Sequence, residues 1–203
     1  MAFIEDYKAH VAQRAELGVP ALALSAEQTA QLIELIKTEC TDELLDLLTN
    51  RVAPGVDDAA QVKAAFLNEI AAENITVDAI SPLRAVEMLG MMLGGFNVLP
   101  MVHALASSNS AVVDAAVEAL SKTLLVYDAF NDVEKLHRDG NAAATKVMNS
   151  WANAEWFTAK APIPEEITVT VYKVPGETNT DDLSPASEAF TRSDIPLHAN
   201  SLL

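Results

Sequence analysis

The sequence predicts a mainly α-helical fold followed by the first strand and the loop of an incomplete α/β unit. Apolar residues recur three and four positions apart from the start of the chain to about residue 160, which is typical of amphipathic helices. Ile167, Val169 and Val171 then alternate with polar residues, which is typical of a strand. No second alternating run follows, and one strand cannot form a stable sheet. We therefore expect an all-α domain over residues 1–160 and the truncated start of a β/α domain over residues 161–203.

Capping residues indicate where several helices begin. Ser25 and Gln28 have the spacing of a capping box, in which each side chain bonds the backbone of the other residue. Thr41, Asp57 and Ser81 are good N-caps, and Ser81 is followed by a proline at the first helical position. The helices expected in chain order are one through Ile4 and Val11 that ends at Gly18, four that follow Ser25, Thr41, Asp57 and Ser81 (the last closed by Gly94 and Gly95), and four over residues 100–105, 110–127, 132–137 and 141–157.

Short loops join these helices, so consecutive helices are expected to pack as antiparallel pairs. Stacked pairs of roughly 40 residues form HEAT-like solenoids, and we expect a HEAT-like helical-pair array here. The sequence contains no clean internal repeat. A compact, non-repetitive helical bundle is therefore the alternative.

Composition and charge exclude several classes of protein. The 203 residues contain 13 Lys and Arg against 29 Asp and Glu, which gives a formal net charge of -16. Without a basic run, the chain alone is not expected to bind nucleic acid. The longest apolar stretch, residues 88–102, is interrupted by glycines and Pro100 and is shorter than the ~20 residues of a membrane span. Charged residues near the N-terminus argue against a signal peptide, so we expect a cytoplasmic location.

Metal-binding patterns are missing from the sequence. Cys40 is the only cysteine, and one thiolate cannot form an internal disulfide or hold an iron–sulfur cluster. The histidines do not have metal-ligand spacing, and His103 is expected in the core or at an interface. Four methionines are interpreted as core filling and three aromatic residues as anchors of the last helix: Met88, Met91, Met92 and Met101, and Trp151, Trp156 and Phe157.

A polar loop follows the expected strand. Asp181, Asp182 and Ser184 are turn formers whose side chains bond backbone groups or ligands. Arg192 presents a guanidinium that matches carboxylates and phosphates. Residue chemistry alone favours a surface ion-pair network in which Arg192 pairs with Asp181, Asp182 or Asp194, and an anion-binding site is the alternative.

Several motifs resemble one known family at consistent spacing across essentially the whole chain. The loop contains GETNTDDLSPA at 176–186 and RSDIPLHA at 192–199. The helical region contains LLDLLTNRVAPGVDDAAQVKAAFL at 44–67, MLGGFNVLPMV at 92–102 and NSWANAEWF at 149–157. These segments resemble the N-terminal helical domain and the opening of the swivelling domain of the bacterial aconitase B family.

The resemblance implies a lyase of the tricarboxylic acid cycle that interconverts citrate and isocitrate through cis-aconitate, with 2-methylisocitrate as a substrate of some members. It implies a [4Fe-4S] cluster in the full-length enzyme, which acts as a Lewis acid. The substrate-binding arginine of the family falls on Arg192, which would grip a tricarboxylate, and we expect Asp181, Asp182 and Ser184 to shape the loop. The cluster cysteines, the catalytic serine and the other substrate-binding arginines of the family belong to later domains. This chain alone is therefore expected to bind no cluster and to be inactive.

The family also implies functions in association. Its helical domain is thought to support homodimers, channelling contacts and iron-responsive regulation, and some members bind messenger RNA. The charge of -16 argues that this segment does not supply the RNA contact. The alternative is a free-standing HEAT-like protein-interaction module, which would leave the strand and the loop unexplained.

Overall fold

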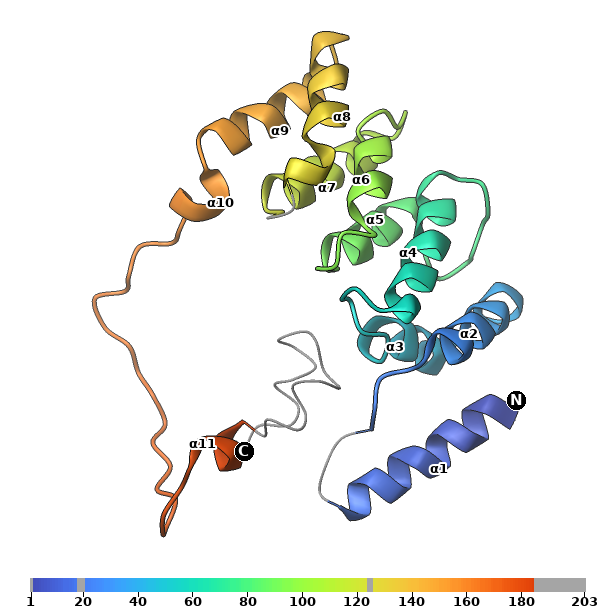
Figure 1. The fold of residues 1–203 in the computed structure, drawn as a ribbon, viewed down its shortest axis with the longest axis vertical. Helices are drawn as coiled ribbons and strands as arrows, with labels where there is room; N and C mark the ends of the chain where they lie inside the picture. The colour runs from blue at the N-terminus through green and yellow to red at the C-terminus, as the bar shows by residue number, and fades with distance from the viewer. Residues whose placement is uncertain (1, 18–20, 124–125, 185–203) are drawn as a thin grey trace.

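The computed structural model describes residues 2–17, 21–123 and 126–184, which are mainly helical up to residue 158. The helices follow one another along a curved row, from α1 at the N-terminal end to α10 (Figure 1). They are α1 (Ala2–Glu16), α2 (Ala26–Thr38), α3 (Asp42–Asn50), α4 (Asp58–Ala71), α5 (Pro82–Gly90), α6 (Val98–Ala104), α7 (Ser110–Ser121), α8 (Val126–Arg138), α9 (Ala142–Ala152), α10 (Glu155–Thr158) and α11 (Thr180–Leu183).

Neighbours along the chain are also neighbours in space. The principal contacts of α4 are with α2, α5 and α6, and those of α7 are with α5, α6 and α9. Each helix from α2 to α10 thus packs mainly on helices one or two places away in the sequence. Such contacts are typical of a stacked array, whereas a compact bundle would also bring distant helices together. The mainly α fold is confirmed, and the compact-bundle alternative is not favoured.

The predicted N-caps are confirmed. Ser25 and Gln28 form both bonds of the capping box, at 3.0 and 3.2 Å. The side chains of Thr41, Asp57 and Ser81 each accept a hydrogen bond from the backbone N–H three residues later. These bonds satisfy amides that a helix leaves without an intrahelical acceptor, so the start of each helix is fixed locally.

Two of the predicted helix boundaries are wrong. The helix expected over 110–127 ends at Ser121, where the N–H groups of Lys122 and Thr123 turn back to the carbonyls three residues before them. The helix expected over 141–157 is split after Ala152, because Ala154 has a left-handed backbone with φ 49°. A left-handed residue ends a helix, and α10 is a separate short turn.

Two further helix boundaries, on either side of Gly94 and Gly95, also differ from those predicted. α5 ends at Gly90, four residues before Gly94, and α6 begins at Val98 rather than at Pro100. Pro100 is therefore in the first turn of α6, where its missing N–H costs no hydrogen bond. Asn97 lies between the two helices and is buried, and its side-chain NH₂ donates to the carbonyls of Leu89 and Met92 at 2.8 and 2.9 Å.

Two loops meet backbone to backbone in the middle of the array. The N–H of Leu93 donates to the carbonyl of Pro54 at 2.8 Å. A Cβ added at Gly94 would lie only 1.8 Å from the carbonyl oxygen of Gly55, so no side chain fits at this position. The loop before α4 and the loop before α6 are therefore fastened together, and this contact fixes how α3–α4 stacks on α5–α6.

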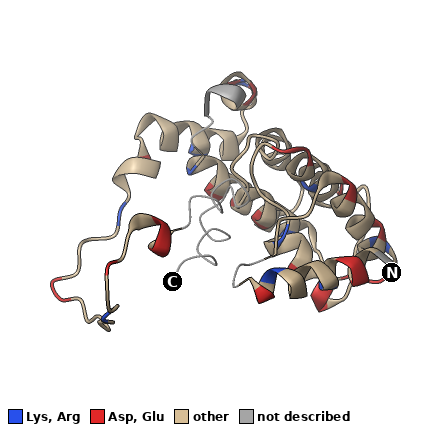
Figure 2. Cartoon of the chain, turned by 60° about the horizontal axis from the view of Figure 1, so that its bottom comes forward, with Lys and Arg blue, Asp and Glu red and all other residues tan. Residues whose placement is uncertain are grey.

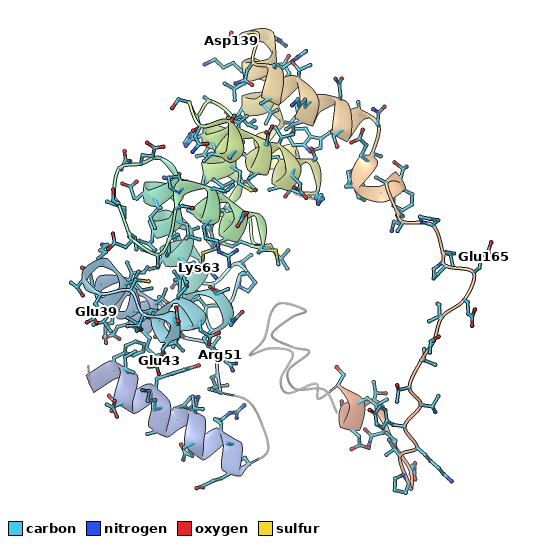
Figure 3. All side chains as sticks on the ribbon, turned by 180° about the vertical axis from the view of Figure 1, so that it is seen from behind. Glu39, Glu43, Arg51, Lys63, Asp139 and Glu165 are labelled. Carbon is cyan, nitrogen blue, oxygen red and sulfur yellow. The ribbon has the colours of Figure 1, made fainter. Side chains whose placement is uncertain are left out.

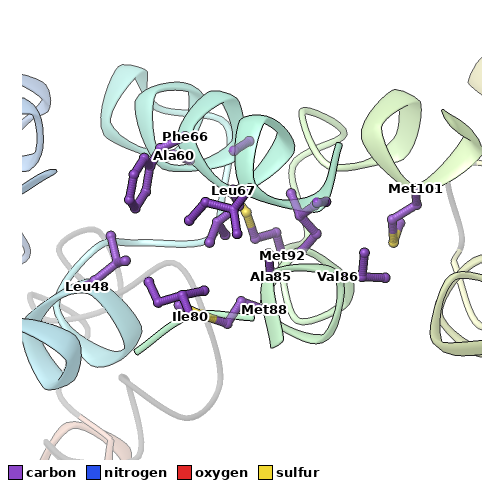
Figure 4. Close-up of a cluster of buried hydrophobic side chains, with 14 of the residues drawn as sticks. Leu48, Ala60, Phe66, Leu67, Ile80, Ala85, Val86, Met88, Met92 and Met101 are labelled. Atoms are coloured by element: carbon purple, nitrogen blue, oxygen red, sulfur yellow. The ribbon is translucent and has the colours of Figure 1, made fainter. Parts of the chain in front are cut away.

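The hydrophobic core is continuous along the array. Leu48 of α3, Leu67 of α4 and Leu89 of α5 are fully buried, and Figure 4 shows part of this cluster. Met88, Met92 and Met101 are buried as predicted, but Met91 is 70% exposed because it follows the last residue of α5 and faces away from the core.

The first helix is attached by a few specific contacts. The hydroxyl of Tyr7 donates to the carbonyl of Leu22 at 3.0 Å, and Lys8 pairs with Glu43 of α3 at 3.0 Å. Phe3 joins the core beside Tyr7. Acidic and basic residues are spread over the helices (Figure 2), and ion pairs between exposed side chains, such as Lys122 with Glu118, add little stability.

Candidate functional site

The candidate loop begins after a long extended connection. Residues 159–179 contain no helix or strand, and their side chains are exposed (Figure 1). Gly176 has a left-handed backbone with φ 89°, which favours glycine and turns the chain before α11. α11 is then one short turn, Thr180–Leu183, on the exposed surface.

A second capping box builds this turn. The side-chain oxygen of Asn179 accepts hydrogen bonds from the N–H groups of Asp181 and Asp182 at 2.8 and 3.0 Å. The carboxylate of Asp182 accepts in return from the N–H of Asn179 at 2.9 Å. The N–H of Ser184 closes the turn on the carbonyl of Thr180 at 2.8 Å. Asp182 thus bonds the backbone, whereas Asp181 contributes its own N–H and presents its side chain to solvent.

Arg192 lies outside the described residues, so the structure does not place it relative to Asp181, Asp182 and Ser184. Asp194, one of its three suggested partners in a surface network, also lies outside the described residues. Asn179, whose side chain organises the turn, is not among the site residues predicted from the sequence. Its position three residues before Asp182 is the signal that would have found it, since that is the spacing of a capping box.

The predicted strand is not formed in the described part of the chain. Ile167, Val169 and Val171 are 66%, 69% and 84% exposed, and residues 167–172 have no ladder partner there. A strand needs a neighbour to satisfy its backbone groups and to cover its apolar face. The alternating pattern is therefore present as an extended segment with its apolar side chains in solvent.

Cys40 is half-buried at the end of α2. Burial raises the pKa of its thiol, and the nearby carboxylates of Asp42 and Asp78 raise it further. A raised pKa keeps the sulfur protonated, which makes Cys40 a poor nucleophile and a poor metal ligand at neutral pH. Within the described residues no group of three or more His, Cys, Asp and Glu side chains could hold a metal ion.

Predictions about His103 and the aromatic residues hold only in part. His103 is exposed on α6, so it does not lie in the core, and its place at an interface stays a prediction. Trp151 does anchor α9, since its indole N–H donates to the carbonyl of Leu120 at 2.8 Å. Trp156 and Phe157 do not, because they lie on α10 beyond the break in the helix and are 46% and 61% exposed.

Shallow grooves run along α4. One of about 410 Å³ lies between α2 and α4 and includes Ile33 and Phe66. Two more, of about 230 and 220 Å³, lie between α4 and α6 and share Asn68, Pro100 and His103. These grooves could not be predicted from the sequence, because a groove depends on how far apart two helices pack.

Across the described ranges, no helix combines the length and the apolar character that crossing a bilayer requires.

Comparisons with known proteins agree over nearly the whole chain. The family model described as the aconitate B N-terminal domain matches residues 6–157, and the model described as the aconitate hydratase 2 N-terminus matches residues 169–203. The chain is similar to proteins named aconitate hydratase B. The identity is 53% for that of Synechocystis sp. and 52% for that of Salmonella typhimurium, each over 98% of this chain. It is 46% for that of Helicobacter pylori, over 99% of this chain.

The chain spans only 23% of the length of the Salmonella and Synechocystis proteins. The free-standing module is not favoured, because the similarity extends through the extended segment and the loop as well as the helices. The chain belongs to the aconitate hydratase B family and contains the N-terminal domain of that family.

Proposed function

We propose that this chain acts as the N-terminal part of an aconitate hydratase that interconverts citrate and isocitrate through cis-aconitate in the cytoplasm. The observation that carries the proposal is the identity of 46–53% over at least 98% of the chain to proteins named aconitate hydratase B. The similarity extends into the loop that contains Asp181, Asp182 and Arg192, where a family model matches residues 169–203. Tricarboxylates are the substrate class of the proposed reaction.

The chain divides functionally at the extended connection. We assign residues 1–160 to a HEAT-like helical domain and residues 161–203 to the start of the swivelling domain. The exposed apolar residues Ile167, Val169 and Val171 support this division, because they would be covered once further strands pair with them.

Arg192 is proposed to grip a carboxylate of the substrate through its guanidinium fork. The capping box at Asn179 supports a structural role for the preceding segment, in which Asp182, Asp181 and Ser184 hold the turn rather than contact substrate. A fixed turn would limit the positions that the following residues can adopt, which is how a loop positions a binding side chain.

The residues of this chain do not fit a [4Fe-4S] cluster. Such clusters are held mainly by several cysteine thiolates, whereas this chain has only Cys40, whose thiol is half-buried with a raised pKa. The cluster of the proposed enzyme would therefore be held by residues outside this chain, and this chain alone is proposed to be inactive.

The helical domain is proposed to mediate association, including a homodimer. The grooves along α4 support this role, as do the exposed side chains of Leu99 on α6 and of Met91 and Leu93 in the loop before it, because exposed apolar groups that gather on a surface are typical of interaction sites. Sedimentation of the purified chain tests it, and a strict monomer at high concentration would remove the dimer from the proposal.

A chimera tests the enzymatic role directly. The matching N-terminal part of the Escherichia coli aconitate hydratase B, which is 51% identical, is replaced by this chain, and hydration of cis-aconitate is measured. We expect activity within about tenfold of the parent, and Arg192→Lys should lower kcat/KM by about 100-fold or more because Lys loses the bidentate grip. Arg84→Lys on α5 is the matched control. An inactive chimera that is folded and contains its cluster would contradict the proposal.

A further inference from the structure

The two grooves between α4 and α6 adjoin each other. They share Asn68, Pro100 and His103, with α4 on one side and α6 on the other. The part of about 230 Å³, which we call the C-terminal part, lies at the C-terminal ends of both helices and is also lined by Glu73. The part of about 220 Å³, which we call the apolar part, lies farther back along the helices and is lined by the exposed Leu99.

The C-terminal part of the groove favours a positive charge. Residues from the C-terminal ends of α4 and α6 line it, and the C-terminal end of a helix carries a partial negative charge. Glu73 adds a carboxylate at the same place. Among the described residues, the side chains of Glu73 and His103 have no hydrogen-bond or ion-pair partner. Their acceptor groups are therefore available to a ligand.

The two helices supply no cation to this groove. Lys63 is the only lysine or arginine of α4 (Figure 3), and its ammonium donates to the carbonyl of Thr49 on α3 at 3.4 Å. α6 contains neither lysine nor arginine, and none is among the residues that line the two parts. The groove thus presents negative groups without a basic side chain of its own.

Glu73 has a backbone conformation that suits glycine better. Its φ is 59°, in the left-handed region, and it follows the C-cap of α4. The N–H of Glu73 donates to the carbonyl of Ile70 at 3.0 Å, and the N–H of Asn74 donates to the carbonyl of Glu69 at 2.9 Å. These bonds form a Schellman motif, whose left-handed position is usually glycine because a Cβ costs free energy there. A side chain present at that cost indicates a role for its carboxylate.

We propose that the groove between α4 and α6 binds a polypeptide segment in which a lysine or arginine side chain lies beside an apolar one. Glu73 and the two helix ends bind the cationic side chain, and the imidazole of His103 can accept one of its hydrogen bonds. The apolar side chain packs in the part lined by Leu99. A small organic cation would fill only the C-terminal part, whereas two adjoining parts match two neighbouring side chains.

This inference rests on the proposed role of the helical domain in association, and it specifies the chemistry of the partner. The two proposals fail in different experiments. A strict monomer in sedimentation would remove the homodimer and leave the groove as a binding site. A chain that self-associates but does not bind a basic peptide would remove only the site described here.

NMR titration of the isotopically labelled 203-residue chain tests the site. The probes are two acetylated and amidated dipeptides, leucyl-arginine and arginyl-leucine, because the groove does not fix the direction of the segment. At least one of them should shift the backbone amides of residues 71–74 and 103–108 in a saturable way. Replacing its arginine with citrulline, which keeps the shape and removes the charge, should weaken binding by about tenfold or more.

Two variants of Glu73 separate binding from folding. Glu73→Gln should weaken binding of the arginine peptide by about tenfold or more, because the amide loses the charge-assisted hydrogen bonds. Glu73→Gly should weaken it as much while raising Tm by about 2–4 °C, because glycine relieves the left-handed backbone. Glu118→Gln on α7 is the matched control, since Glu118 is exposed and pairs with Lys122 at 2.6 Å, and it should leave binding unchanged.

Binding that depends both on the charge of the peptide and on Glu73 would support the proposal. The proposal is overturned if neither dipeptide shifts these amides or if the citrulline peptide binds as tightly as the arginine peptide. It is also overturned if Glu73→Gln binds the arginine peptide as tightly as the parent chain does.

Discussion

Replacing Gly94 with alanine should separate two loops that now touch through their backbones. The new Cβ would lie 1.8 Å from the carbonyl oxygen of Gly55, 2.3 Å from its carbonyl carbon and 2.9 Å from the nitrogen of Val56. Non-bonded carbon atoms pack at about 3.5–4.0 Å, so the loops must move apart by more than about 1 Å. All three neighbours are backbone atoms, and none can rotate away as the end of a side chain could.

The cost has two parts. Overpacking a tight contact costs about 1–3 kcal/mol. The movement also stretches the hydrogen bond from Leu93 N–H to Pro54, now 2.8 Å, which contributes about 0.5–1.5 kcal/mol. We therefore expect the free energy of unfolding of Gly94→Ala to fall by about 2–4 kcal/mol and Tm to fall by roughly 5–15 °C.

Urea unfolding followed by circular dichroism measures this loss, with Gly140→Ala as the matched control. Gly140 has a left-handed φ of 90° and no atom within 4 Å of an added Cβ, so alanine there adds only backbone strain of about 1–2 kcal/mol. Gly94 lacks a left-handed backbone and should lose stability by steric overlap alone. If Gly94→Ala loses no more than Gly140→Ala, the two loops do not meet as described.

Three other changes test separate parts of the structure. Asn97→Ala should lower the free energy of unfolding by about 2–4 kcal/mol, because the carbonyls of Leu89 and Met92 lose their shared donor, and urea titration would show little change if water replaced it. Asn179→Ala should leave the global stability unchanged and increase the exchange rate of the Asp182 amide, measured by NMR, since the turn at α11 is exposed; unchanged exchange would argue against the capping box. Cys40 should react with iodoacetamide more slowly than a free thiol at pH 8, because burial raises its pKa. Since the folded thiol ionises at a higher pH than the unfolded one, its contribution to stability should be present below the unfolded pKa and decline above it, and Cys40→Ser should remove that part of the pH dependence.

Features set by local hydrogen bonds were predictable from the sequence. Ser25, Thr41, Asp57 and Ser81 start their helices where expected, because a cap and the amide it accepts from are only three residues apart. The break at Ala154 was not predictable in this way, since a left-handed backbone is normally a property of glycine or asparagine and nothing in this residue indicates it.

Features that depend on packing could not be predicted. The pair Gly94 and Gly95 indicated the end of a helix, but only the stacked array shows that Gly94 faces Gly55 of another loop. His103 was expected in the core or at an interface because apolar residues surround it in the sequence, and the structure contradicts only the core position, since a short helix still exposes one face. Lys63 is the opposite case, since a charged residue is normally exposed. It is buried because the end of α3 supplies a carbonyl that accepts from its ammonium.

Within the candidate site, the sequence predicted the turn around Asp182 but not the exposed state of the segment before it. The alternation at Ile167 and Val169 is a strand pattern. Such a pattern indicates which face of a strand would be buried, but it does not show whether a neighbouring strand is present to cover that face. The role of Arg192 stays a prediction, since it rests on the resemblance of its motif alone.

We propose above all that residues 167–184 belong to the start of a unit that the rest of an aconitate hydratase completes. Hydrogen exchange measured by mass spectrometry tests it on the same residues in two settings, the 203-residue chain and the chimera with the Escherichia coli enzyme. In the chain alone the amides of residues 167–174 should exchange at nearly the rate of an unfolded peptide, because they lack backbone partners in the described structure. In the chimera the same amides should be protected by about 100-fold or more, and equal exchange in both settings would contradict the account.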